Sequence, residues 1–417
     1  MTNSSLAVHG RLCPICGSPE RRAVLRLVST PLGDRFAESQ AGALALPAFP
    51  LDVARCESCG HCFLPDLTAA DDSYQHYLFA TSQSPGLEAS FAEVVSDIVL
   101  RHDLMDGELV LDIGANDGSW LQCFREAGCD VVGVEPAPGP ARSTEDRGIP
   151  VVRDYFSEKS VRSPGLLTRT PRIVSMNYVF ANMPDPLEAL RDIGAIADDE
   201  TVISVLTGYH PAQLAVGMFD YVYHEHVSYF SCRDLASMAD SIGFVVTYAR
   251  EVPLKGGSIH VEMQRAVDGR EQSSLFSLML KREAWLDQPQ DAQWTAIEGQ
   301  VLETRGKMLT ALRDARSAGL RIVGYGASHS TTTLQYALGI EADIDVIVDD
   351  HAAKIGRFAP GTGVPVLSSE ALDDGAPSCV VVLAWQHGPR IRDSLRARGF
   401  SGTVITPFPT MSIERFG

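Results

Sequence analysis

Residues 109–120 read LVLDIGANDGSW, an apolar run that ends at Asp112 and is followed by a glycine turn and the start of a helix. Three more apolar runs follow at intervals, separated by longer mixed stretches: VVGVEP at 131–136, IVSMNYVF at 173–180 and TVISVL at 201–206. Short buried strands that alternate with helices form a parallel sheet covered by helices. The sequence therefore predicts an α/β, Rossmann-like domain around this stretch.

The turn at 114–118 predicts a nucleoside pocket rather than a dinucleotide site. Its glycine spacing is not GxGxxG, and the acidic side chains of Asp112 and Asp117 would repel a pyrophosphate. Glu135 ends the next strand, where an acid can accept hydrogen bonds from the two ribose hydroxyls of a nucleoside. A cationic sulfonium cofactor fits these charges. The alternative interpretation is an ordinary strand-to-helix turn.

Two pairs of cysteines near the N-terminus have the spacing of a metal site. Cys13-Pro-Ile-Cys16-Gly and Cys56-Glu-Ser-Cys59-Gly are CxxC knuckles whose glycines let backbone N–H groups turn toward the thiolates. Four thiolates suit a tetrahedral structural zinc ion, which leaves no open position for chemistry. The alternative is four unrelated buried cysteines; a redox role is weaker, because neither pair starts a helix after a strand.

The composition is that of an ordinary globular protein, with 417 residues and a net charge of −18. This length predicts two or three domains. The acidity, with no Lys/Arg-rich run, argues against a nucleic-acid partner. No stretch has the length and apolarity of a membrane span or a signal peptide, so we expect a cytoplasmic protein with reduced cysteines.

Outside the central domain, the chain changes character twice. From about residue 270 to 318 it is polar and helical, and it then returns to apolar runs, RIVGYGA, IDVIVDD, VPVLS, CVVVLAW and GTVITP, which predict a second doubly wound sheet. The expected segments are a zinc-binding domain at 1–75, the central domain at 76–268, a helical linker at 269–318 and a Rossmann-like domain at 319–417.

The segment YVYHEHVSYFS at 221–231 crowds titratable and aromatic groups together. Tyr223, Glu225 and His226 lie within four positions, and a histidine beside a glutamate can be oriented and made more basic by hydrogen bonding. The alternatives are a solvated surface loop, or a metal site at His224 and His226, which lacks a third ligand with an obvious spacing. We interpret the segment as catalytic.

In their order along the chain, these motifs resemble the nucleotide-sugar C-methyltransferases, which make branched-chain deoxysugars. The resemblance covers nearly the whole chain and also includes GGSIHV at 256–261, GYGAS at 324–328, IDVIVDD and PGTGVPV at 360–366. It implies a class I S-adenosylmethionine-dependent methyltransferase domain. It also implies a reaction, in which a base removes the proton at carbon 3 of a nucleotide-linked 4-keto-6-deoxysugar and the enolate takes the methyl group.

The resemblance further implies residue roles. His226 would be the base, with Tyr223 and Glu225 beside it and Tyr77 reaching in from the first linker. Cofactor contacts would come from Asp112, Gly114, Asn116, Asp117, Gly118, Glu135 and Asn177. Substrate contacts would come from Asn182, Ser258, His260, Tyr325, Ser328 and Arg357, with the GYGAS loop offering donors to a diphosphate at a helix N-terminus.

Three positions depart from the family's pattern. Asn182 stands where a histidine is common, Lys255 and His260 stand where His and Arg are common, and the lysine that often follows GYGAS is absent. These changes favour a different sugar, keto position or related acceptor. Two alternatives stay open at this point: O- or N-methylation of a sugar or small metabolite, and a catalytically silent nucleotide-sugar-binding protein. The oligomeric state, monomer or dimer, is also open.

Overall fold

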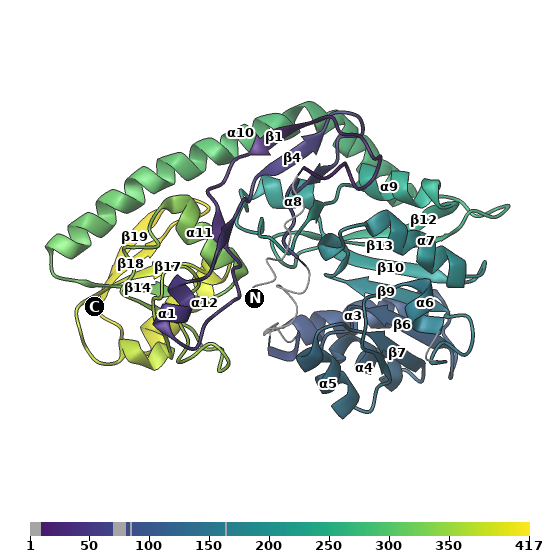
Figure 1. Cartoon of the computed structure of the whole chain (residues 1–417), viewed down its shortest axis with the longest axis horizontal. Coiled ribbons are helices and arrows are strands. Elements are labelled where there is room, and N and C mark those ends of the chain that lie inside the picture. Colours follow the sequence, from purple (N-terminus) through teal and green to yellow (C-terminus); the bar gives the residue numbers. More distant parts are fainter. Residues whose placement is uncertain (1–9, 70–80, 84–85, 163–164) are drawn as a thin grey trace, which may run out of the picture.

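The computed structural model describes residues 10–69, 81–83, 86–162 and 165–417, which form three domains (Figure 1). The N-terminal domain lies against both of the others, and one long helix crosses the top of the molecule in this view. The predicted limits of the four segments stay a prediction. None of the helices in these described ranges has the length and apolarity to cross a membrane.

The N-terminal domain is built on a small antiparallel sheet that continues into the central part of the chain. Its own strands are β1 (Arg21–Leu25), β4 (Val53–Cys56) and β5 (Cys62–Phe63). The fourth strand is β11 (Ser228–Tyr229), which pairs with β5 so that Tyr229 lies opposite Cys62. The zinc-binding domain therefore shares a sheet with the segment predicted to be catalytic.

A second part of the N-terminal domain reaches toward the C-terminal domain. It holds the strand pair β2 (Thr30–Pro31) and β3 (Ala48–Phe49) and the short helix α1 (Gln40–Leu44). Ala37 forms a β-bridge with Phe358 of the C-terminal domain. This domain thus contacts both sides of the molecule.

The central domain is a seven-stranded sheet in the order β12-β13-β10-β9-β6-β7-β8. The strands are β6 (Leu109–Ile113), β7 (Asp130–Val134), β8 (Val151–Val152), β9 (Ile173–Asn177), β10 (Val202–Gly208), β12 (Phe244–Val252) and β13 (Ser258–Arg265). β6 to β10 pair in parallel, whereas β13 runs antiparallel between β10 and β12. The order reverses beside β6, which is where open α/β sheets bind their ligands.

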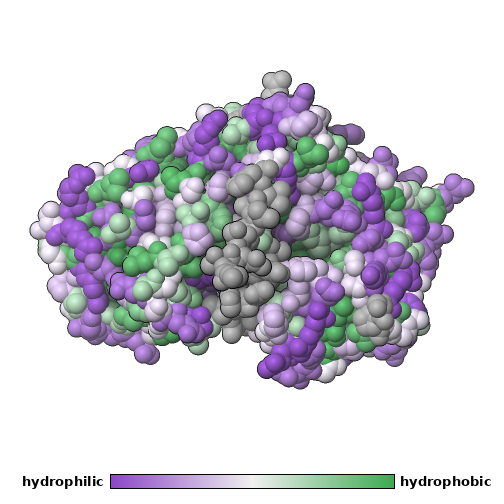
Figure 2. Space-filling model, viewed as in Figure 1, coloured by the Kyte–Doolittle hydropathy of each residue, from purple (hydrophilic) through white to green (hydrophobic). Residues whose placement is uncertain are grey.

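Helices and short helical turns cover this sheet, as the alternating pattern predicted. They are η1 (Thr81–Gln83), α3 (Leu87–Arg101), α4 (Ser119–Glu126), α5 (Pro138–Asp146), α6 (Glu158–Arg162), η2 (Phe180–Asn182), α7 (Pro186–Ile196), α8 (His210–Ala215) and α9 (Cys232–Ser241). Every residue of β6 is buried, because helices pack on both faces of a parallel sheet. Figure 2 shows hydrophilic residues gathered over the outer helix α5.

A single helix, α10 (Ser274–Ser317), joins the central and C-terminal domains. It packs against β1, α8, α9 and the C-terminal domain (Figure 1). One hydrophobic cluster runs through all of these parts, with Leu25 from the N-terminal domain, Phe219 from the central one, Trp294 from α10 and Leu334 from the C-terminal one. The domains are therefore packed together around a shared core.

The C-terminal domain is a six-stranded sheet in the order β16-β15-β14-β17-β18-β19. Its elements are β14 (Arg321–Tyr325), α11 (His329–Leu338), β15 (Val346–Val348), β16 (Val366–Leu367), η3 (Ser369–Leu372), β17 (Ser378–Val382), η4 (Trp385–His387), α12 (Gly388–Ala397), β18 (Gly402–Thr406) and β19 (Ser412–Phe416). The five predicted runs hold β14 to β18. The antiparallel edge strand β19 was not predicted, because the sequence SIERF has no continuous apolar run.

Candidate active site

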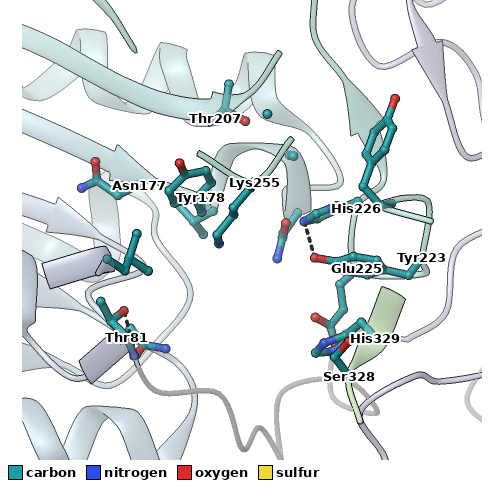
Figure 3. Close-up of a pocket in the computed structure, with 18 of the residues that line it drawn as sticks. Thr81, Asn177, Tyr178, Thr207, Tyr223, Glu225, His226, Lys255, Ser328 and His329 are labelled. Carbon is teal, nitrogen blue, oxygen red and sulfur yellow. Dashed lines mark hydrogen bonds and ion pairs between the residues drawn. The ribbon is translucent and has the colours of Figure 1, made fainter. Parts of the chain in front are cut away.

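One large cavity lies between the domains and has a volume of about 1550 Å³. A site for one small molecule usually measures about 300–1000 Å³, so this cavity has room for two ligands. Asp34 lines it from the N-terminal domain, Glu135 and His226 from the central domain, and Ser328 and His329 from the C-terminal domain. Figure 3 shows Asn177 and Tyr178 on one side and the cluster of Tyr223, Glu225 and His226 on the other.

The carboxyl ends of β6 and β7 bring two carboxylates to the first side of the cavity. Asp112 accepts hydrogen bonds from the Ser175 hydroxyl at 2.6 Å and the Asn177 amide nitrogen at 3.0 Å, and burial raises its pKa to about 7. Glu135 accepts from the backbone N–H groups of Asn116 and Ala137 at 2.9 and 2.8 Å, and burial raises its pKa as well.

These residues fit a cationic nucleoside cofactor. Asn177 lines the cavity, and its buried Oδ1 has no hydrogen-bond partner among the described residues, so it is available to a donor on a ligand. Gly114 and Ala115 bring backbone to the cavity, and Gly114 has a φ of +76° that a side chain would strain. Two buried carboxylates favour a positively charged ligand over a diphosphate.

The two remaining loop residues predicted to contact the cofactor do not line the cavity. Asp117 accepts a hydrogen bond from the backbone N–H of Ser82 at 2.8 Å, which fixes η1 against the loop. Gly118 precedes α4 as its N-cap, with a φ of +76°, and packs on Thr144. Asp117 and Gly118 therefore support the conformation of the loop without lining the cavity.

On the opposite side, His226 is held in one tautomer. Its Nδ1 lies 2.8 Å from the carbonyl oxygen of Tyr221, which can only accept, so Nδ1 carries the proton. Nε2 is left as an acceptor and receives the hydroxyl of Tyr223 at 2.7 Å. Burial lowers the pKa of His226 to about 3, which keeps the imidazole neutral, and its basic nitrogen is the one beside Tyr223.

Glu225 forms an ion pair with His329 of α11, with 2.9 Å between Oε1 and Nε2. Burial alone would lower the pKa of His329, but the carboxylates of Glu225 and Asp34 outweigh it and raise the pKa. The Tyr223 ring lies between two imidazoles, with centroids 3.9 Å from His226 and 4.9 Å from His329. His329 was not predicted, because nothing in the local sequence indicates a partner 104 positions away.

The six residues predicted to contact substrate divide into two groups. Asn182, Tyr325 and Ser328 line the cavity, and the buried Oδ1 of Asn182 has no partner among the described residues. Ser258, His260 and Arg357 do not line it.

The second group is held by other contacts. The Ser258 hydroxyl oxygen accepts a hydrogen bond from the Tyr178 hydroxyl at 3.1 Å, outside the cavity lining. His260 is buried in β13, where its ring nitrogen lies 2.9 Å from the Ser204 hydroxyl. Arg357 donates to the carbonyl oxygen of Phe36 at 3.3 Å. The proposed catalytic residue Tyr77 lies outside the described residues.

The four cysteines of the two knuckles come together in the N-terminal domain. All four sulfur atoms lie within 4.8 Å of one another. Cys13 and Cys59 are 3.6 Å apart and Cys16 and Cys56 are 3.5 Å apart, whereas tetrahedral zinc with sulfur ligands at about 2.3 Å needs about 3.8 Å. Small shifts would complete a closed site, so these thiolates fit structural zinc, which would hold the knuckles together and perform no chemistry.

Comparison with known proteins agrees with this geometry. Three family models match in order: a zinc binding domain at 13–74, a methyltransferase domain at 77–249 and a C-methyltransferase C-terminal domain at 253–409. The chain is 28% identical over 399 residues to the C-methyltransferase NovU of Streptomyces niveus, and the match covers 95% of each chain.

Solved methyltransferase structures match less than half of the chain, and two of them serve as examples. The magnesium protoporphyrin IX methyltransferase of Synechocystis with bound S-adenosylmethionine gives a TM-score of 0.34 at 15% identity, covering 43% of this chain and 80% of that one. An S-adenosylmethionine-dependent methyltransferase of Clostridium acetobutylicum gives 0.36 at 8% identity, covering 45% and 94%.

The fold and the cavity define an S-adenosylmethionine-dependent methyltransferase with a structural zinc site. More narrowly, the chain has the domain order of a C-methyltransferase with an N-terminal zinc-binding domain, and it is similar over nearly its whole length to the C-methyltransferase NovU.

Proposed function

We propose that the protein methylates carbon 3 of a nucleotide-linked 4-keto-6-deoxysugar through an enolate, in the biosynthesis of a branched-chain sugar in the cytoplasm. S-adenosylmethionine, held near Asp112, Glu135 and Asn177, supplies the methyl group. The observation that carries the proposal is His226, a neutral histidine with its acceptor nitrogen on the cavity side opposite the cofactor residues.

The geometry supports separate roles for His226 and Tyr223 at the acceptor. A carbon becomes nucleophilic only after it loses a proton, and His226 Nε2 is the base that faces the cavity. Tyr223 donates to this nitrogen in the structure. When the acceptor binds, the Tyr223 hydroxyl would donate to the keto oxygen instead, which frees Nε2 to take the proton.

The C-terminal domain supports a nucleotide-linked acceptor. Tyr325 lines the cavity from the end of β14, Gly326 and Ser328 line it from the β14–α11 loop, and Asp350 lines it from just after β15. Ser328 caps α11 by accepting the Thr331 N–H at 3.3 Å. Backbone donors at this helix N-terminus would hold a diphosphate, and Arg390, which lines the same side, would offset the acidity of the chain.

The proposal is tested by incubating the protein with S-adenosylmethionine, carrying a ¹³C-labelled methyl group, and dTDP-4-keto-6-deoxyglucose. The expected product contains the label bonded to carbon 3, located by long-range carbon–proton correlations in NMR spectra. A label bonded to oxygen would refute C-methylation of this sugar. An unlabelled sugar, with cofactor binding intact, would mean that the acceptor is another compound.

A further inference from the structure

Strained backbone gathers at the cavity. Four non-glycine residues in the described ranges have positive φ, and three of them, Asn116, Tyr178 and Lys255, line the cavity. Such a conformation costs about 1 kcal/mol or more and persists where the surroundings require it, often at functional sites. Tyr178 and Lys255, with φ of 55° and 50°, also contact each other.

This contact fixes the Lys255 ammonium at the cavity. Its Nζ lies 3.8 Å from the centre of the Tyr178 ring, a cation–π distance. The Tyr178 hydroxyl donates to Ser258 at 3.1 Å, and Ser258 donates to the carbonyl oxygen of Leu254 at 2.9 Å. The exposed side chain of Lys255 points into the cavity, between Tyr178 and His226 (Figure 3).

Two other cations of the cavity lie beside carboxylates. Lys354 lies 2.8 Å from Asp34, and His329 lies 2.9 Å from Glu225, so carboxylates balance both of them. The Lys255 ammonium is packed on the ring of Tyr178, which directly follows Asn177, one of the residues predicted to contact the cofactor. A cation in that position favours a ligand with negative charge next to the methyl donor.

A weak base at His226 would need a nearby positive charge to stabilise the enolate that it forms. Burial lowers the pKa of His226 to about 3, and the charge of Lys255 also contributes to the decrease. A base this weak removes a proton from carbon only if the resulting negative charge is strongly stabilised. Tyr223 supplies one neutral hydrogen bond, whereas an ammonium ion supplies a full positive charge.

We propose that Lys255 forms an oxyanion subsite, in which its ammonium donates a hydrogen bond to the acceptor oxygen that becomes negative during methyl transfer. The carbon–hydrogen bond breaks, its proton goes to His226, and its electron pair moves toward the oxygen. Those electrons then form the bond to the methyl group, and the electron pair of the methyl–sulfur bond stays on sulfur. This inference rests on the proposed function for the identity of the acceptor, and not for the presence of the subsite.

Binding of oxalate, a planar mimic of an enediolate, tests the subsite without turnover. Calorimetry on the protein loaded with S-adenosylhomocysteine should show oxalate binding that weakens at least about tenfold in Lys255→Met and is retained in Lys255→Arg. Lys307→Met, at an exposed position on α10, is the control and should bind as the wild type does. Absence of oxalate binding to the wild type, or equal binding to Lys255→Met, would overturn the subsite.

Activity separates this inference from the proposed function. With a keto-sugar nucleotide that the wild type methylates, Lys255→Met should lower kcat about 100-fold or more while affinity for S-adenosylhomocysteine is kept. The Lys255 side chain is open to the cavity, but the surrounding protein partly removes it from bulk water and lowers its pKa to about 8. Wild-type activity should therefore fall above that pH, and Lys255→Arg should retain it. An unchanged kcat in Lys255→Met would overturn the inference alone. Oxalate binding through Lys255 without sugar methylation would refute the proposed function alone.

Discussion

Glu225 of the central domain and His329 of the C-terminal domain form an ion pair at 2.9 Å beside the Tyr223 ring. Tyr223 in turn donates to His226. The cluster that faces the cofactor side is therefore complete only when the two domains are packed together.

The stability of wild type relative to His329→Gln should depend on pH. The pKa of His329 is raised in the folded chain, so the contribution of its protonated form is full below its unfolded pKa of about 6.5 and is lost as pH rises through the folded pKa. We expect the difference in melting temperature to be largest near pH 6 and to shrink above it. Scanning fluorimetry measures this, and a pH-independent difference would contradict the ion pair.

The pH dependence of kcat/KM should show no ascending limb from His226. Because burial lowers its pKa to about 3, the imidazole is already neutral throughout the range from about pH 5 to 9. Steady-state rates across that range check this prediction. A limb near the ordinary histidine pKa of about 6.5, lost in His226→Gln but not in His329→Gln, would show that His226 titrates normally.

Loss of zinc should disable the distant active site. The knuckle strand β5 pairs with β11, where Tyr229 lies three positions after His226. We expect elemental analysis to find one zinc per chain, and Cys16→Ser to lower both zinc content and activity. Cys123→Ser changes a cysteine on α4 outside the cluster and is the matched control. Full activity in a zinc-free protein would contradict the coupling.

Glu135→Gln should weaken cofactor binding about tenfold to 100-fold, because hydrogen bonds to a charged group contribute about 1.5–3 kcal/mol. Calorimetry with S-adenosylhomocysteine gives the dissociation constant directly. Glu145→Gln serves as the control, because Glu145 is an exposed acid on the outer helix α5 that pairs with Arg153. Equal affinity in both variants would place the ribose elsewhere.

Local patterns explain why the cofactor side and the zinc site could be predicted. Asp112 and Glu135 each end an apolar run, and parallel strands bring their carboxyl ends to one edge of the sheet. Cys13, Cys16 and the second knuckle carry their chemistry in their own spacing. Each of these patterns is contained in a few consecutive residues, so it can be recognised without knowledge of the tertiary structure.

The rest depends on packing between distant segments. His329 lies in the first turn of a helix in another domain, and Lys255 depends on the conformation of a turn between β12 and β13. His260 is in a conspicuous motif, yet the alternation of β13 turns its side chain into the sheet, against Ser204. Sequence alone fixes neither the domain packing nor which segments reach the cavity.

The most direct test of the account is hydrogen exchange at carbon 3 of dTDP-4-keto-6-deoxyglucose in deuterated water, with the protein loaded with S-adenosylhomocysteine. Mass spectrometry and NMR should show deuterium entering that position with the wild type, and exchange slowed about 100-fold or more with His226→Gln, which still binds the cofactor product. Exchange at the same rate in both proteins would contradict His226 as the base. No exchange with the wild type, together with tight cofactor binding, would contradict enolate chemistry on this sugar.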